Sequence, residues 1–455
     1  MNFKLSLSVC VLAALLSACT LNPAANKAES ESVSASRPVS ATSAVSSAPE
    51  AASASTTASE STSTASSASE AASAASSAPD VANVVFSAPE AVNMASSAPD
   101  GAPALAISAN GTELLLKSKG KPQQITVVSP DALPSVADGS NIAVKITADG
   151  QPVFEGSSAQ LNTFSPKQNG QYLYEFTVAD GAAAGTYQVA ANCKFQPQIS
   201  FSSPKVTLGE ALVLHANYVD GMKVTATTDL PFQPKFYAYD GGMMAILPVA
   251  YTTPVGTYQL KIQAGAQNFH YTISVQGRDF VVQNLTVDAG VTANTAKSDT
   301  ANAEWATKIE PLKKISEPVK YWSGAFLQPV QGEITTEFGV IRYTNGSKIA
   351  TRHSGIDIAA SQGTQIAAAN AGKVQFADFL QLTGNTVVLD HGMGLKSFYY
   401  HMNSLDVTAG TLVKKGDPIG KVGTTGFSTG PHLHYSLLVN DVFINPWTAF
   451  DQGIE

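Results

Sequence analysis

The chain has 455 residues, which is too long for one compact core, and at about 100 to 200 residues per domain it predicts two to four folded units. Its formal net charge is −8 and charged residues make up only 14% of it, so we expect no nucleic-acid partner. The three cysteines are too scattered along the chain to predict a disulfide framework or a cysteine-based metal site.

Residues 1–18 have the features of a signal peptide. Lys4 precedes an apolar run of the length of a signal hydrophobic region, and this run is too short to span a bilayer. It ends in the tetrapeptide Leu16-Ser17-Ala18-Cys19, which resembles the bacterial lipobox, in which the cysteine is acylated and becomes the first residue. The alternative is an ordinary signal peptide with a chance cysteine at this position.

Acylation of Cys19 would anchor the protein to a membrane, because several acyl chains bind far more stably than one. Thr20 follows the cysteine in place of Asp. By resemblance to lipoprotein sorting in Gram-negative bacteria, this favours the outer membrane, with the protein facing the periplasm or the cell surface. Cys10 would be lost with the signal peptide, so we expect Cys193 to be the one free thiol and to be buried.

Residues 19–103 carry the lipidated cysteine and a segment dominated by Ser and Ala, in which Ser-Ala-Pro-Glu or Ser-Ala-Pro-Asp recurs. Such a composition buries too little apolar area to offset its chain entropy, so it predicts a disordered tether. A flexible chain of this length has an end-to-end distance on the order of 50 Å, which lets an anchored domain reach well away from the membrane.

Residues 104–195 and 196–287 each predict a small β-sandwich, because short β-rich runs alternate with Gly, Pro, Asn and Asp. Gly-Thr-Tyr-Gln-Val at 185–189 recurs as Gly-Thr-Tyr-Gln-Leu at 256–260. Both resemble the penultimate strand of an immunoglobulin-like sandwich, in which a tyrosine packs at the corner. Residues 288–317 then predict a helical connector with an apolar stripe at helical spacing, interrupted by Pro311.

Five of the seven histidines lie in the last 103 residues: His353, His391, His401, His432 and His434. The other two, His215 and His270, fall in alternating strand patterns, where a core or surface histidine is the expected interpretation. Zinc is bound by nitrogen, sulfur or carboxylate donors, and a catalytic zinc site keeps three protein ligands and one open position. The C-terminal cluster can supply such a set without cysteine.

The spacing of two motifs favours a shared site in residues 318–455. His353 and Asp357 form a His-x-x-x-Asp motif, and His432 and His434 flank Leu433. Side chains two residues apart on a strand lie on one face, so both imidazoles of the second motif should point to the same place. The first motif and one of the later histidines would complete a three-ligand set.

Residues 332–450 resemble the lysostaphin-like, LytM-type zinc metallopeptidases, which cleave peptide bonds in bacterial peptidoglycan. The family motifs occur in order: His-x-x-x-Asp from His353, Asp-His-Gly-x-Gly from Asp390, Tyr-x-His ending at His401, and the signature over residues 424–434. The resemblance implies a mainly β fold, in which two immunoglobulin-like β-sandwich modules precede a C-terminal barrel-like β-sandwich domain.

The resemblance also implies roles for five residues. His353, Asp357 and His434 would bind one Zn²⁺ per chain, and His401 and His432 would be the catalytic histidines beside the metal. Which of the two takes a proton from water and which stabilises the oxyanion is left open.

Other residues near the motifs are expected to have structural roles. His391 fits the structural part of the family pattern. Tyr343, Phe427 and Tyr435 would line the groove or simply pack.

The implied function is that of a monomeric zinc endopeptidase whose partner is peptidoglycan. One alternative is a catalytically silent wall-binding lipoprotein that activates a separate amidase, and another is a carrier module, which would explain none of the histidines. The expected bond is the D-alanyl to diaminopimelyl cross-link in a Gram-negative wall, or a pentaglycine bridge in a Gram-positive one. The upstream modules would cover the groove, hold glycan strands or act as spacers.

Overall fold

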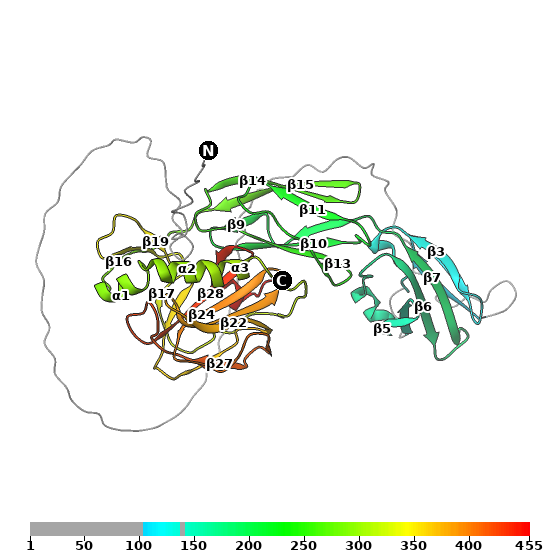
Figure 1. Ribbon diagram of the computed structural model, residues 1–455. Helices are drawn as coiled ribbons and strands as arrows, with labels where there is room; N and C mark the ends of the chain where they lie inside the picture. The colour runs from blue at the N-terminus through cyan, green and yellow to red at the C-terminus, as the bar shows by residue number, and fades with distance from the viewer. Residues whose placement is uncertain (1–102, 137–141) are drawn as a thin grey trace, which may run out of the picture. The chain divides into compact units, whose positions relative to one another are not determined.

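The computed structural model describes residues 103–136 and 142–455, so the predicted signal peptide, Cys19 and the tether lie outside the described residues. Within the described residues the fold is mainly β, as the sequence predicted, and the helices are few and short (Figure 1). No helix between residues 103 and 455, outside the 137–141 gap, is long and apolar enough to cross a membrane.

The first β unit is a five-stranded sheet in the order β3-β7-β6-β4-β5, beside a β1-β2 hairpin. Its strands are β1 (Ala104–Ala109), β2 (Thr112–Lys117), β3 (Gln123–Val127), β4 (Ala143–Ala148), β5 (Gln151–Ser157), β6 (Gly170–Val178) and β7 (Gly185–Cys193). Cys193 is a free, buried thiol among the apolar residues of this core, which matches the expectation from sequence. The hydroxyl of Tyr187 donates to the Ala183 carbonyl oxygen, 2.6 Å away.

The second β unit is a sandwich of two four-stranded sheets, β12-β13-β10-β8 and β11-β14-β15-β9. Its strands are β8 (Gln198–Phe201), β9 (Lys205–Thr207), β10 (Ala211–Asn217), β11 (Val224–Thr228), β12 (Tyr237–Tyr239), β13 (Gly242–Pro248), β14 (Gly256–Ala264) and β15 (Gln267–Gln276). Leu214 of one sheet and Ile262 of the other lie in the same buried cluster. Alternation along each strand therefore fills the space between the sheets.

Tyr258 in this second unit repeats the contact made by Tyr187, because its hydroxyl donates to the Pro254 carbonyl oxygen at 2.7 Å. Each tyrosine thus ties the start of its strand to the turn four residues earlier, as corner tyrosines do. The repeated segment is the penultimate strand only here, where β15 follows β14; in the first unit β7 is the last strand.

The connecting segment contains strand β16 (Val282–Leu285) and helices α1 (Ala289–Asn294), α2 (Asp299–Lys308) and α3 (Glu310–Lys313). The side chain of Ser298 caps α2 by accepting a hydrogen bond from the Ala301 backbone N–H. Pro311 lies in the first turn of α3, where a missing N–H costs nothing. Trp305 and Ile309 are buried against the C-terminal domain.

The C-terminal domain is built on an eight-stranded antiparallel sheet with the path β17-β20-β28-β24-β23-β22-β26 and β29 paired to β28 (Figure 1). These strands are β17 (Glu333–Thr336), β20 (Ile356–Ala359), β22 (Gly372–Leu380), β23 (Gly384–Gly392), β24 (Leu395–Met402), β26 (Leu412–Val413), β28 (His432–Val439) and β29 (Val442–Ile444). Two smaller sheets join β16 with β18 (Ile341–Thr344) and β19 (Thr351–Arg352), and β21 (Gln365–Ala367) with β25 (Ser404–Leu405) and β27 (Pro418–Lys421). Helix α4 (Pro446–Asp451) follows the last strand.

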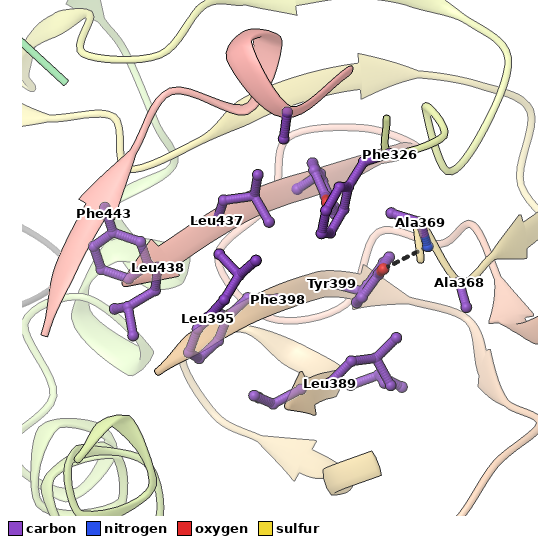
Figure 2. Close-up of a cluster of buried hydrophobic side chains, with 14 of the residues drawn as sticks. Phe326, Ala368, Ala369, Leu389, Leu395, Phe398, Tyr399, Leu437, Leu438 and Phe443 are labelled. Atoms are coloured by element: carbon purple, nitrogen blue, oxygen red, sulfur yellow. Dashed lines mark hydrogen bonds between the residues drawn. The ribbon is translucent and has the colours of Figure 1, made fainter. Parts of the chain in front are cut away.

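One face of the large sheet covers the domain core. Tyr399 and Leu437 lie among its buried side chains with Phe326, and the Tyr399 hydroxyl accepts a hydrogen bond from the Ala369 backbone N–H at 2.9 Å (Figure 2). Because strand side chains alternate between faces, the neighbours of these core residues lie on the opposite face. That face carries Asp357 and His434, whereas His391 lies on the core side against Phe326.

Candidate metal site

Two adjacent strands bring the predicted ligands together. Strands β20 and β28 pair antiparallel, and the register places Asp357 directly opposite His434. On β20 the flanking residues Ile356 and Ile358 are fully buried in the core, so Asp357 projects from the other face. His353 lies four residues earlier and reaches the same point.

Three donor atoms converge at this point: His353 Nε2, His434 Nδ1 and Asp357 Oδ1. The first lies 2.9 Å from each of the other two, and His434 Nδ1 lies 2.8 Å from Asp357 Oδ1. All three residues are buried, and within the described part of the chain they form the one group with this geometry of His, Cys, Asp and Glu donors. Tetrahedral zinc with ligands at about 2.0–2.1 Å separates them by roughly 3.3 Å, so a small relaxation fits this triangle to one ion.

The protonation states also call for a cation. His353 Nδ1 lies 2.9 Å from the Glu337 carbonyl oxygen, which can only accept, so in the neutral imidazole the Nε2 atom carries a lone pair. That lone pair faces the Asp357 carboxylate, which also only accepts. A divalent ion in the centre turns this repulsive contact into coordination, because zinc binds neutral imidazoles and carboxylates through lone pairs.

Electrostatics keep the donors in their metal-binding forms. In the metal-free site burial by itself raises the pKa of Asp357, but the charge that His353 carries when protonated and the hydrogen bonds that His353 and His434 then donate outweigh it and hold this pKa well below its usual range. Burial lowers the pKa of His434 to about 4. The carboxylate is therefore charged and the His434 imidazole is neutral at neutral pH.

His401 and His432 lie beside the three donors. Their ring centroids are 4.8 Å apart, and His432 Nε2 lies 3.9 Å from Asp357 Oδ1. His432 Nδ1 donates to the Gly430 carbonyl oxygen at 2.8 Å, and His401 Nδ1 donates to that of Thr425 at 2.8 Å. Both rings in their neutral forms therefore present an Nε2 lone pair, and burial lowers the pKa of His401 to about 3.

His401 has a φ of 62°, a left-handed conformation that is uncommon outside glycine. The preceding residue, Tyr400, already points to the same face as His434, because these two residues pair across the strands. Regular alternation would turn His401 toward the core. The left-handed backbone instead keeps His401 on the metal-site side, which is the kind of local strain found at functional sites.

The remaining motif histidine has a structural environment. His391 is completely buried, its Nδ1 donates to the Ala371 carbonyl oxygen at 2.7 Å, and its Nε2 lies 2.8 Å from Ser397 Oγ. Burial lowers its pKa to about 4, so it is a neutral core residue. Tyr435 is also buried in the core, stacked on Phe450, and does not line a groove.

Two side chains near the site were missed by sequence reasoning. Arg342 on β18 donates to Asp357 Oδ2 at 2.9 Å, and the ring of Tyr400 stacks on that of His434. For Tyr400, strand alternation was the one sequence feature that could have indicated its place on the metal-site face. No local pattern pointed to Arg342, whose contact depends on strand pairing.

The part of the chain that holds these residues is similar to known peptidases. A model of peptidase family M23 matches residues 351–446. The peptidoglycan DD-endopeptidase ShyC of Vibrio cholerae serotype O1 is 31% identical over 200 residues, which are 42% of this chain and 41% of that protein. The DD-carboxypeptidase/endopeptidase Mpg of Neisseria meningitidis serogroup B is 42% identical over 94 residues, which are 21% of this chain and 22% of that protein.

A crystal structure of a putative peptidase M23 from Pseudomonas aeruginosa aligns with 24% identity and a TM-score of 0.41, covering 56% of this chain and 97% of that one. The chain spans less than half the length of the two curated relatives described above.

Proposed function

Because the C-terminal part of this chain is a domain of peptidase family M23, we propose that the protein is a zinc-dependent endopeptidase that hydrolyses peptide cross-links or stem peptides of peptidoglycan. The observation that carries the proposal is the convergence of His353, Asp357 and His434 on one point, with His401 and His432 beside it. A zinc peptidase needs both a bound metal and a proton-transfer group beside it.

Zinc, when bound, supplies Lewis-acid polarisation of a carbonyl and lowers the pKa of water to about 7. The chain's own part is to hold the ion through His353, Asp357 and His434 and to move protons beside it. The Nε2 lone pair of either His401 or His432 takes the proton of the attacking water. The proton taken by that Nε2 can then pass to the leaving amine, and the other imidazole, in its protonated form, would donate to the developing oxyanion.

The bond that we propose is the DD cross-link, from D-alanine to the diaminopimelyl residue of a neighbouring stem peptide. Its support is that one curated relative is named a peptidoglycan DD-endopeptidase and the other a DD-carboxypeptidase/endopeptidase. To test this, a protein comprising residues 104–455 is incubated with defined cross-linked muropeptides, and the masses of the fragments are measured. Monomeric stem peptides as products support the proposal, and cleavage of a pentaglycine bridge alone contradicts it.

The activator alternative predicts a different result in the same assay. A silent wall-binding protein leaves purified sacculi intact by itself and accelerates their digestion by an added amidase. The alternative is excluded if the protein alone cleaves the cross-links. This activity should be lost on treatment with a zinc chelator and restored by added zinc.

We also propose that Cys19 carries a lipid anchor that holds the protein in the outer membrane. The support is the tetrapeptide ending at Cys19 and the Thr20 that follows it. Cys19→Ser should move the protein from the membrane fraction to the soluble fraction, and Thr20→Asp should shift it toward the inner membrane. Unchanged fractionation of Cys19→Ser would contradict the anchor.

A further inference from the structure

The two oxygens of the Asp357 carboxylate have different partners. Oδ1 faces the imidazoles of the site, 2.9 Å from His353 Nε2 and 2.8 Å from His434 Nδ1. Oδ2 faces away from them and accepts a hydrogen bond from Arg342 Nη2 at 2.9 Å. The carboxylate is buried, so this ion pair is shielded from water.

Arg342 is itself held on two further sides. The same Nη2 atom donates to Thr336 Oγ1 at 2.7 Å, and Nε donates to Gln283 Oε1 at 3.0 Å. Strand pairing sets both contacts, because Gln283 lies opposite Arg342 in the parallel β16–β18 pair and Thr336 lies opposite Asp357 in the β17–β20 pair. The guanidinium is thus fixed in place before any metal binds.

We propose that Arg342 is a positioning residue of the metal site, which presents Asp357 Oδ1 to the ion by binding Oδ2, and that Gln283 from the connecting segment holds Arg342 in place. A carboxylate has a broad, roughly two-fold torsion about its last bond, so an untethered Asp357 would rotate and offer either oxygen. A planar guanidinium with fixed donors restricts that rotation in a way that a point-like ammonium group does not.

The expected magnitude follows from the general behaviour of such partners. Loss of an outer hydrogen-bonding partner of a metal ligand typically reduces metal affinity or activity by about 10- to 100-fold. The inference rests on the metal site and not on the proposed substrate. It is therefore tested by metal binding alone, before any peptide is cleaved.

The experiment uses residues 104–455 and measures the zinc dissociation constant by competition with a chromophoric chelator at one fixed pH. Arg342→Lys keeps the positive charge and removes the fork, and it should weaken zinc binding about 10-fold or more. Arg278→Lys is the matched control, because Arg278 pairs with Glu210 in the second β unit, at 2.6 Å, and should leave zinc binding unchanged. Thermal unfolding of the zinc-free proteins shows whether each variant is folded.

A second set of variants, Gln283→Ala and Thr336→Val, is measured in the same zinc-binding experiment. Each removes one acceptor of Arg342 without touching a ligand, so each should weaken zinc binding in the same direction and by less than Arg342→Lys. These two variants decide the outcome if Arg342→Lys does not fold.

Zinc affinity within two-fold of the wild type in folded Arg342→Lys would overturn the inference. If that variant is unfolded, wild-type affinity in both Gln283→Ala and Thr336→Val would overturn it. If the wild type binds zinc but cleaves no muropeptide, that result contradicts only the proposed function. Failure of the wild type to bind zinc would remove the metal site and this inference with it.

Discussion

The ring of Tyr400 stacks on the imidazole of His434, with centroids 5.0 Å apart and planes 3° apart. Tyr400 also makes a T-shaped contact with Trp305 from helix α2, with centroids 6.1 Å apart and planes at 84°. A residue of the connecting segment therefore supports a predicted metal ligand through one intervening ring. The Tyr400 hydroxyl is buried without a hydrogen-bond partner, and burial raises its pKa well above the usual range.

Tyr400→Phe should keep zinc affinity and equal or exceed the wild type in stability. The substitution keeps the stacked ring and removes a buried hydroxyl whose unmet hydrogen bond costs about 1–3 kcal/mol. Tyr400→Ala should instead lose about 3–5 kcal/mol of unfolding free energy and weaken zinc binding, because a cavity opens against His434. Urea unfolding and chelator competition measure the two effects, and a Phe variant less stable than the wild type would contradict the argument.

Removing a metal ligand and removing a proton-transfer group should have separable effects. His434→Ala should lose both zinc and cleavage of cross-linked muropeptides. His401→Ala should keep most of the zinc and lose activity by about 100- to 10,000-fold, the usual contribution of general acid–base catalysis. Zinc content by atomic absorption and fragment release are the two measurements, and exposed His270→Ala is the control that should change neither. Loss of zinc from His401→Ala would assign His401 to the ligand set.

Strand periodicity predicted much of the site geometry from sequence. The His-x-His spacing predicted two imidazoles on one face, and in the structure both His432 and His434 lie near Asp357 Oδ1. The mainly β fold of the described residues was likewise evident from short alternating runs between turn residues. These features depend on a few consecutive residues, so they can be predicted from the sequence of a short segment.

The residues that hold the metal ligands in place could not be predicted from the sequence, because their contacts join segments that are distant along the chain. Gln283 meets Arg342 across 59 positions of chain, and nothing in either segment alone pairs β16 with β18. Left-handed backbone at His401 is equally invisible, because a histidine gives no conformational signal of the kind that glycine gives. Register and packing, which require the whole fold, decide these features.

The connecting segment should be required for the stability of the C-terminal domain. Trp305 is 3% exposed, and its indole N–H donates to Glu310 Oε1 at 3.0 Å. Trp305→Ala in residues 104–455 should lower the unfolding free energy by about 3–5 kcal/mol, whereas Trp305→Phe keeps most of the packing and should lose less. Glu310→Gln, which keeps an acceptor for the indole, is the control for the hydrogen bond.

The same packing predicts the behaviour of a shortened protein. Residues 318–455 lack Trp305 and strand β16, so they should unfold at lower urea than residues 104–455 and bind zinc more weakly. Equal urea midpoints for the two proteins would show that the segment is only a spacer. A faster cleavage rate for a shortened protein that remains folded would favour a covering role for the upstream units.

Acid should destabilise the fold through His391. Its pKa is lowered to about 4 by burial, while an unfolded chain restores the usual value of about 6.5. Between these values the unfolded state binds the extra proton, so the contribution to stability is complete above about pH 6.5 and falls by up to roughly 1.4 kcal/mol per pH unit toward pH 4. His391→Asn keeps a donor for the Ala371 carbonyl oxygen and should show a shallower loss of stability on acidification, as measured by urea unfolding at several pH values in the presence of a chelator. His270→Gln, at an exposed position, should follow the wild-type pH profile, and a His391→Asn profile parallel to the wild type would show that His391 does not set the acid sensitivity.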